Sequence, residues 1–369
     1  MSNYPTKKLG EICDILIGGT PRRGVYKYWN GGNLPWVSIA DLTKSSKEII
    51  DTKEKITKIG VDESNAKLIP KGTLLFSFKL SIGKLAFAGT DLYTNEAIAG
   101  LTIKDKKVLD KNFLYYFLKQ IIHDNLTKAV KGNTLNKEKI KNIQIPIPPL
   151  EIQKKIVERI EKLMAKIDEA KKLRKEAMSD ASSLIPSALN KIFEEGKKKG
   201  WEEKELGGLI ETMTPPEKIK KKDFKQKGEY PVIDQSQNEI AGWTDDLASL
   251  VNIKKPAVIF GDHTCAIKYC EKTFAQGADG IKILSTNEVL LPKFLYLVLK
   301  NKPIKPEGYR RHFSKLKKYK IPLPPLPEQQ KIVKYLDSLS EKVRKIQNLQ
   351  SETEMELKLL EKSVLNNAF

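Results

Sequence analysis

The sequence predicts an α+β protein: two mixed α/β lobes separated by two long antiparallel coiled-coil helices, related by an internal pseudo-twofold duplication. Three observations predict it. A proline-rich stretch followed by a long helical pattern occurs twice, the two copies stay in register without a gap, and short β-type runs fill the segments between them. We expect lobes over residues 1–149 and 197–325, and helices over residues 150–196 and 326–369.

The duplication is clearest where each helix begins. At an offset of 176 residues, 18 of the 49 aligned pairs from Ile145/Ile321 to Phe193/Phe369 are identical. The prolines cannot lie inside a helix and favour extended residues before them, so each copy joins an extended segment to a helix. An ungapped repeat of this length indicates an internal duplication. The two starts are Ile145-Pro146-Ile147-Pro148-Pro149-Leu150 and Ile321-Pro322-Leu323-Pro324-Pro325-Leu326.

Both helical segments carry a heptad pattern. Apolar residues recur at spacings of four and three, which is typical of a coiled coil, and alanines of the first copy match larger residues of the second. An amphipathic helix on a globular core is the alternative. We expect Pro186 to kink or end the first helix near Ile185. The residues predicted to pack between the helices or against a partner protein are Ile156, Ile160, Leu163, Ile167, Leu184, Ile332, Leu336, Leu339, Val343, Ile346, Leu357 and Leu360.

The first lobe shows the mixed pattern of an α/β domain. Residues 9–17 form a helix or a strand that ends at the turn residues 18–21. Three short β-branched or aromatic runs predict strands, and one longer amphipathic run predicts a helix. The strands are expected over 34–39, 74–78 and 82–88, and the helix over 112–122.

The second lobe repeats this plan, which extends the duplication beyond the helices. Three short stretches of one lobe correspond to three of the other: Leu206-Gly207 to Leu9-Gly10, Ala257–Phe260 to Leu74–Phe78, and Phe294-Leu295-Tyr296 to Phe113-Leu114-Tyr115. The lobes have diverged more than the helices. This favours two lobes that recognise different targets and two helices that share one task.

The charge distribution points to a polyanionic partner. The 369 residues contain 66 Lys and Arg against 46 Asp and Glu, a formal net charge of +20. Residues 1–150 carry 24 basic and 14 acidic side chains, residues 200–325 carry 22 and 16, and residues 326–369 carry 7 of each. Basic lobes favour nucleic acid, and a neutral, apolar-striped helix favours protein contacts.

Other composition signals predict a cytoplasmic protein. Cys13, Cys265 and Cys270 include no CxxC pair, which is typical of a reducing compartment. No apolar run is long enough for a membrane span, and no signal-peptide pattern opens the sequence. We therefore expect a cytoplasmic location and no membrane partner.

A search for catalytic motifs favours a non-catalytic protein. The sequence has no Walker A motif, no GxGxxG and no Asn/Asp-Pro-Pro-aromatic signature. His263-x-Cys265-x4-Cys270 lacks a fourth ligand and has atypical spacing for zinc. Asp/Glu-x-Lys triplets are expected by chance in a chain this rich in Lys and Glu, so a nuclease site is not predicted. No bound metal or cofactor is expected.

These residues resemble one family, the DNA-specificity (S) subunit of type I restriction–modification systems. Both proline–helix repeats resemble its conserved regions, with similar Leu-Asn-x-x-Phe endings. Segments of both lobes resemble target-recognition domains: residues 18–37 and 94–101 in the first, and residues 231–234, 260–264 and 277–280 in the second.

The resemblance implies a division of labour. Each lobe would read one half of a bipartite, asymmetric site in double-stranded DNA, and the helices would set the spacer. Two modification (methyltransferase) subunits would dock on this chain, and motor–nuclease (restriction) subunits would join for cleavage. S-adenosylmethionine, ATP and magnesium would belong to those partners. The alternative is a non-catalytic structural coiled-coil nucleic-acid-binding protein unrelated to restriction.

Candidate DNA contacts are basic side chains in the lobes. Arg in a glycine-rich loop can reach guanine edges or phosphates. A solvated surface is the alternative for each Lys and for the arginine pairs, and a structural role is the alternative for His263. Packed loop anchors are the preferred role for Tyr26, Tyr28 and Trp29. The candidates of the first lobe are Arg22, Arg23, Lys27, Lys79, Lys84, Lys131 and Asn133. Those of the second are Lys220, Lys221, Lys222, His263, Lys268, Arg310 and Arg311.

Overall fold

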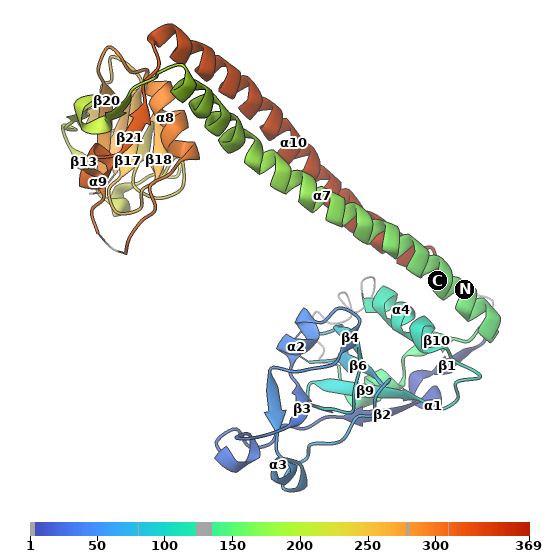
Figure 1. Ribbon diagram of the computed structural model, residues 1–369. Coiled ribbons are helices and arrows are strands. Elements are labelled where there is room, and N and C mark those ends of the chain that lie inside the picture. The colour runs from blue at the N-terminus through green and yellow to red at the C-terminus, as the bar shows by residue number, and fades with distance from the viewer. Residues whose placement is uncertain (1–3, 80, 123–134, 278–279, 309) are drawn as a thin grey trace. The chain divides into compact units, whose positions relative to one another are not determined.

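The computed structural model describes residues 4–79, 81–122, 135–277, 280–308 and 310–369 (Figure 1). The chain divides into two compact units, Met1–Leu173 together with Thr353–Phe369, and Arg174–Glu352. We call them the first and the second unit. Each contains one lobe and a stretch of both long helices, so the first unit is assembled from two separated segments of the chain.

The lobe of the first unit contains two sheets and a strand pair. The larger sheet has the order β2 (Cys13–Ile17), β9 (Ile98–Ile103), β6 (Leu74–Ser77), β7 (Leu85–Ala88) and β4 (Glu48–Ile49). The smaller has the order β5 (Glu54–Ile56), β3 (Leu34–Val37) and β8 (Tyr93–Thr94), and β1 (Thr6–Lys8) pairs with β10 (Gln144–Pro146). The helices are α1 (Leu9–Ile12), the 3-10 helix η1 (Tyr26–Tyr28), α2 (Ile39–Lys44), α3 (Lys58–Asp62), α4 (Lys111–Ile121) and α6 (Lys137–Lys141).

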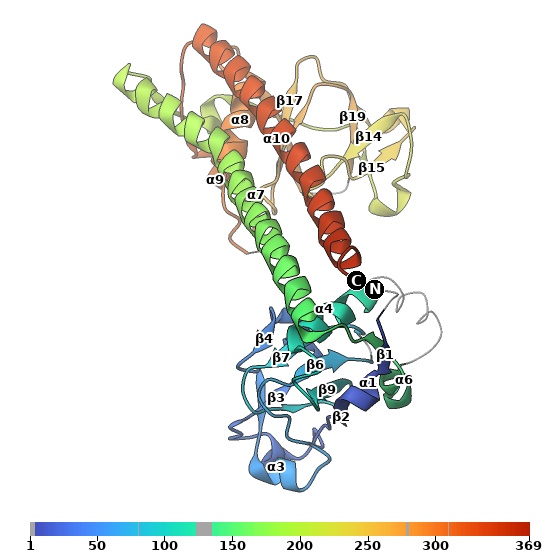
Figure 2. The ribbon, with the colours of Figure 1, turned by 90° about the vertical axis from the view of Figure 1, so that its right-hand side faces the viewer.

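The core of this lobe lies on both faces of the larger sheet. Phe76 packs with the buried residues of α4 on one face, while Leu75, the residue before it in β6, packs with Val37 on the other. Figure 2 shows α4 along the sheet that contains β6 and β7. This alternation follows from the period of a strand. Asp110 starts α4 by accepting hydrogen bonds from the backbone amides of the first turn. Helix α4 therefore covers the face of the sheet nearest the long helices.

The lobe of the second unit repeats this arrangement. Its sheets have the order β12 (Ile210–Met213), β20 (Ile281–Thr286), β17 (Ala257–Gly261) and β18 (Ile267–Cys270), and the order β13 (Lys218–Ile219), β19 (Phe274–Gly277), β14 (Tyr230–Ile233) and β15 (Gly242–Thr244), with β16 (Leu250–Val251) on β19. β11 (Glu203–Glu205) pairs with β21 (Lys320–Pro322). The helices are η3 (Leu206–Gly208), η4 (Lys221–Asp223), η5 (Leu247–Ser249), α8 (Pro292–Asn301) and α9 (Phe313–Lys317).

The two lobes share one topology. The order β12-β20-β17-β18 matches β2-β9-β6-β7, and the parallel pair β14–β19 matches the parallel pair β3–β8. Helix α8 packs on β17 as α4 packs on β6. The predicted two α/β lobes and the extension of the duplication into them are confirmed.

The two long helices are α7 (Leu150–Lys198) and α10 (Leu326–Asn366). In each unit they run antiparallel: Lys171 pairs with Glu361 at 2.8 Å in the first, and the Arg174 guanidinium donates to the Gln350 carbonyl at 3.3 Å in the second. Pro186 was predicted to kink or end the first helix near Ile185; it does not end it, because α7 continues to Lys198 with Pro186 inside, and the kink stays a prediction. No described helix has the length and apolarity needed to cross a bilayer.

The helix seam differs from the predicted one at three positions. Leu163, Leu184 and Leu360 are 36%, 42% and 50% exposed, which corrects their assignment to packing between the helices; their packing against a partner stays a prediction. Leu163 and Leu184 each precede another apolar residue, and the heptad pattern alone does not decide which of two neighbours faces the partner helix. Of the remaining predicted positions, Ile160, Ile167, Ile332, Leu336, Val343 and Leu357 are buried, and Ile156, Leu339 and Ile346 are partly buried.

Candidate nucleic-acid interface

The loop between β2 and η1 carries the first candidate contacts. It leaves the sheet at Gly18 and Gly19, whose backbone amides donate to the carbonyls of Ile98 and Thr94. A Cβ at Gly18 would lie 2.3 Å from the Thr94 carbonyl oxygen, and one at Gly19 would lie 2.3 Å from that of Asn65. Only glycine permits these close approaches, so the start of the loop is fixed by backbone packing.

Arg23 contacts two tryptophans and a carboxylate, although 51% of its side chain is exposed. Its guanidinium carbon lies 4.1 Å from the centroid of the Trp29 ring and 4.7 Å from that of Trp36. The Glu54 carboxylate accepts from both Nη atoms, with the Nη2–Oε2 bond at 3.1 Å. Trp36 and Glu54 are cross-strand partners of β3 and β5. The charge of Arg23 is therefore paired within the lobe.

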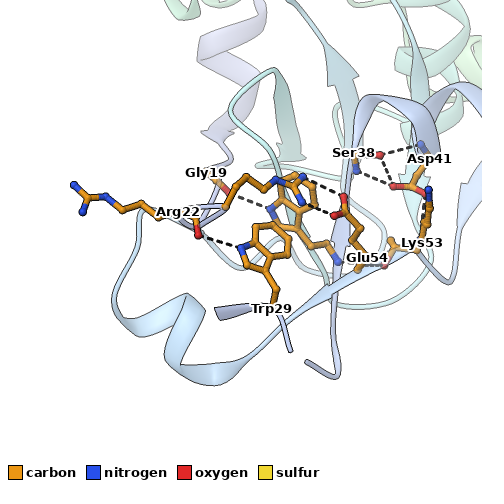
Figure 3. Close-up of polar contacts among 10 residues, drawn as sticks. Gly19, Arg22, Trp29, Ser38, Asp41, Lys53 and Glu54 are labelled. Atoms are coloured by element: carbon orange, nitrogen blue, oxygen red, sulfur yellow. Dashed lines mark hydrogen bonds and ion pairs between the residues drawn. The ribbon is translucent and has the colours of Figure 1, made fainter. Parts of the chain in front are cut away.

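Arg22 differs from its neighbour. Its side chain is exposed and extends away from the tryptophan cluster (Figure 3). Its backbone carbonyl accepts a hydrogen bond from the Trp29 indole N–H at 3.2 Å. Among the residues that the structure describes, Arg22 forms no ion pair. Its guanidinium is therefore available to an external acceptor.

Lys27 lies in the same loop but is paired. Its ammonium is 2.7 Å from the Glu63 carboxylate, which also accepts from the Tyr28 hydroxyl at 2.8 Å. The hydrogen bond with Glu63 raises the pKa of Lys27, and the hydrogen bonds from Lys27 and Tyr28 lower the pKa of Glu63. Both charged groups are solvent-exposed, so DNA phosphates could compete for Lys27.

The other predicted contacts of the first lobe are less constrained. Lys79 and Lys84 are exposed at the β6–β7 turn, and the Lys79 ammonium lies 5.5 Å from the centroid of the Phe78 ring. Lys131 and Asn133 lie outside the described residues. Their predicted contact with DNA stays a prediction.

A polar pocket of about 410 Å³ concentrates cations in the second lobe. It brings together the predicted contacts His263 and Arg311, and adds Lys218 and Lys282, which the sequence analysis did not select. The buried Asp262 also lines the pocket, and its carboxylate accepts from the backbone amides of His312 and Phe313 at 2.9 and 2.8 Å. Strands β12, β13, β19 and β20 and the loop before α9 thus meet at one basic surface.

A second hollow, of about 440 Å³, lies beside this pocket and shares Lys218 with it. Lys220 and Lys222 line it, and Lys221 is exposed in the same turn, η4. Arg310 is exposed next to Arg311. The structure therefore groups the lysine run and the arginine pair around adjoining hollows of one lobe.

Lys268 is separated from that surface. It is 3% exposed, its ammonium donates to the Asp234 carbonyl at 2.7 Å, and it lies 3.7 Å from the Asp234 carboxylate. Burial lowers the pKa of Lys268, although the carboxylate of Asp234 opposes this. Its contacts are internal to the lobe, which argues against the predicted contact with DNA.

Sequence reasoning missed the residues whose role depends on strand pairing. Glu54 and Trp36 are 18 positions apart and meet only because β3 and β5 are adjacent. Lys218 could have been found as the first lysine of the run that continues to Lys222. No local signal marks Lys282, which comes from the interior of β20.

The fold and these surfaces define a class of protein: a duplicated α/β lobe with exposed cations, joined to a pair of long helices. More narrowly, the chain belongs to the family of the type I restriction modification DNA specificity domain, whose model matches residues 1–177 and 198–356. Family membership removes the alternative of a structural coiled-coil protein unrelated to restriction.

Individual relatives carry the name of the same kind of subunit. The type I restriction enzyme MjaIX specificity subunit of Methanocaldococcus jannaschii is 26% identical over 249 residues, which cover 63% of this chain and 57% of that protein, less than two thirds of its length. The putative MjaX specificity subunit of the same organism is 28% identical over 345 residues, 79% of each chain. The EcoR124I/EcoR124II specificity subunit of Escherichia coli is 28% identical over 165 residues, 42% of this chain and 40% of that one.

Solved structures share the fold. A chain from a study of complex assembly and conformational transition of the type I R-M system has a TM-score of 0.76 at 22% identity, covering 99% of this chain and 97% of that chain. The HsdS subunit from Thermoanaerobacter tengcongensis has a TM-score of 0.57 at 21% identity, covering 100% and 97%. The likeness extends over both lobes and both helices.

Proposed function

We propose that this chain gives a type I restriction–modification complex its DNA specificity, with each lobe reading one half of a bipartite, asymmetric site. The observation that carries the proposal is one lobe topology presented twice with different exposed cations. The first lobe offers the Arg22 loop, and the second offers the pocket of His263, Arg311 and Lys282. Equal scaffolds with unequal contact residues suit two unequal half-sites.

Arginines and lysines would divide the contacts. A guanidinium can bind the O6 and N7 of guanine together, so Arg22 and Arg311 are the proposed base readers. Exposed lysines act as point charges, so Lys79, Lys84 and the 220–222 run are proposed to contact phosphates. Loss of a phosphate contact would weaken binding to all sequences and make its salt dependence shallower.

The long helices would set the spacer and hold the partner subunits. On α10, the side chains of Met355, Leu359 and Leu360 are 66%, 67% and 50% exposed. We call these three residues the apolar stripe. Large apolar side chains gathered on one helix favour a protein partner over solvent. We propose that methyltransferase subunits dock there, with S-adenosylmethionine, and that motor–nuclease subunits bring ATP and magnesium.

The test is a methylation map of the source strain with and without this gene. Single-molecule sequencing should reveal a split, asymmetric methyladenine motif that disappears on deletion and returns on complementation. The same motif should appear when the chain and its methyltransferase are co-expressed in a host without the system. A co-expressed, soluble complex that methylates without a bipartite motif would contradict the proposal.

A further inference from the structure

The two adjacent arginines of the first lobe have different partners. The Arg23 guanidinium lies against Trp29 and Trp36 and is paired with Glu54, although 51% of its side chain is exposed. The exposed Arg22 side chain extends away from this cluster (Figure 3). Both residues are arginines, and both lie in the same glycine-rich loop. Any difference in their roles therefore comes from the fold.

The two tryptophans that contact Arg23 also hold the loop on both sides of it. The Trp36 indole donates to the Gly19 carbonyl at 3.1 Å, and the Trp29 indole donates to the Arg22 carbonyl at 3.2 Å. The two rings lie at 88° with their centroids 5.1 Å apart, so the guanidinium contacts both at once. A cation that binds both rings keeps both indole N–H groups directed at the backbone of the loop.

Glu54 is the third residue of this cluster, and the elements next to it hold it in place. It lies opposite Trp36 in the β3–β5 pair. The preceding residue, Lys53, donates its backbone amide to the Asp41 carboxylate at 3.2 Å (Figure 3). The carboxylate is thus fixed by the sheet and by α2, and it fixes Arg23 through two parallel hydrogen bonds.

We propose that Arg23 is a positioning residue and that Arg22 is the specificity-determining residue of this loop. The Arg23 guanidinium, stacked on Trp29 and Trp36 and paired with Glu54, holds the loop so that the Arg22 guanidinium meets the edge of one guanine in the major groove. Holding the loop in this way lowers the entropy cost of ordering the loop and the long Arg22 side chain when DNA binds. The inference rests on the proposed function and assigns two neighbouring arginines different parts of it.

The experiment uses the full chain in complex with its methyltransferase, and measures binding to DNA duplexes that carry every base at each position of the first half-site. The variants are Arg22→Ala, Arg23→Gln, Glu54→Gln and Arg22→Ala/Arg23→Gln, with Lys107→Ala as an exposed cation of the same lobe outside the loop. Salt dependence is measured for each. The wild-type complex must first show the bipartite motif; its absence would contradict the proposed function and not this inference.

Arg22→Ala should lower the preference for one guanine by about 5- to 150-fold, the range of one bidentate base contact. It should leave the second half-site and the salt slope unchanged. Arg23→Gln and Glu54→Gln should relax the same position, and no other, in protein whose thermal transition remains cooperative. In the Arg22→Ala background, Arg23→Gln should cause no further loss of preference, whereas Lys107→Ala should change no base preference.

Three results would overturn the proposal. Unchanged base preference in Arg22→Ala, with a shallower salt slope, would make Arg22 a phosphate contact. Relaxation at a different position in the double variant would make Arg23 a base contact of its own. Unaltered specificity in folded Arg23→Gln and Glu54→Gln would show that Arg23 has a purely structural role.

Discussion

Gln153 and Gln329 make the same three hydrogen bonds in the two copies of the repeat. The Gln153 amide donates to the carbonyls of Pro148 and Val108, each at 2.8 Å, and its oxygen accepts from the Asp110 backbone amide at 2.8 Å. The side chain is fully buried. It joins the first turn of α7 to the segment that starts α4.

In the second copy, the Gln329 amide donates to Pro324 and Val289, and its oxygen accepts from the backbone of Leu291, again all at 2.8 Å. This joins α10 to the start of α8. A buried amide with all these partners satisfied fixes the angle at which a long helix leaves its lobe. The proline motif and its glutamine therefore form one structural unit that occurs twice.

Replacing either glutamine should destabilise the unit that contains it. Gln153→Ala and Gln329→Ala each leave two carbonyls and one amide buried without a partner, at a cost of about 2–4 kcal/mol of unfolding free energy. Chemical denaturation of the full chain measures this. Gln330→Ala, at the exposed neighbouring position, is the matched control and should change stability by less than about 0.5 kcal/mol. Equal stability of Gln329→Ala and Gln330→Ala would contradict the role of this amide.

Charges placed on the apolar stripe should weaken docking of the methyltransferase without changing the stability of the fold. Met355→Glu and Leu359→Glu alter exposed side chains, so the melting temperature should stay within about 2 °C of the wild type. Copurification with the methyltransferase should fall at least tenfold because a buried, unpaired carboxylate opposes the interface. Lys342→Glu, at an exposed position elsewhere on α10, is the control. Full copurification of both stripe variants would place the docking surface elsewhere.

Lengthening both helices should change the spacer alone. Arg174 and Gln350 lie side by side, so a heptad repeated after each of them keeps the seam in register. Seven residues add about 10 Å of helix, which corresponds to roughly three base pairs at about 3.4 Å each. The methylation motif should keep both half-sites and gain roughly that spacing. Insertion in α7 alone provides the mismatched control, and unchanged spacing in the double insertion would refute the spacer role.

Stability should fall at alkaline pH in part because of buried thiols. Burial raises the pKa of Cys13 and of Cys270 to about 12 in each case, from 9.0. Below about pH 9 both states hold the thiol proton; above it the unfolded state loses the proton first, which costs about 1.4 kcal/mol per thiol for each pH unit. The unfolding free energy of Cys13→Ala and Cys270→Ala should therefore decline less steeply than that of the wild type between pH 8.5 and 10.5. Identical slopes would show that these thiols ionise in the folded chain.

The parts of the fold carried by periodic or repeated sequence were predictable. The proline stretches, the helices that follow them and the hydrophobic strands near Leu74 and Ala257 are specified by local patterns. The seam could not be assigned fully, because Leu163 is followed by Met164 and both are apolar. The continuation of α7 beyond Pro186 depends on Leu189 and Phe193, which are anchored in the core of the second unit. Tertiary packing there offsets the hydrogen bond that proline removes.

The sequence predicted which residue types form the candidate interface, but not which of them are paired inside the lobe. Arg22 and Arg23 have the same local signal, and only the pairing of β3 with β5 brings Glu54 to one of them. Lys268 has the charge of a contact residue, yet β18 directs it to Asp234 inside the lobe. Such partners are set by strand pairing between distant segments, which a single sequence does not reveal.

The discontinuous first unit has a consequence for biosynthesis. Its core includes Leu365 and Phe369, whose ring lies 5.5 Å from that of Phe113 and 5.3 Å from that of Phe117. These residues leave the ribosome after the whole of Arg174–Glu352, the contiguous second unit. The nascent chain can thus complete its second unit before its first, reversing the usual N-to-C order of domain folding. Until Leu365 and Phe369 have been synthesised, the apolar face of α4 lacks these two partners and remains open to a chaperone.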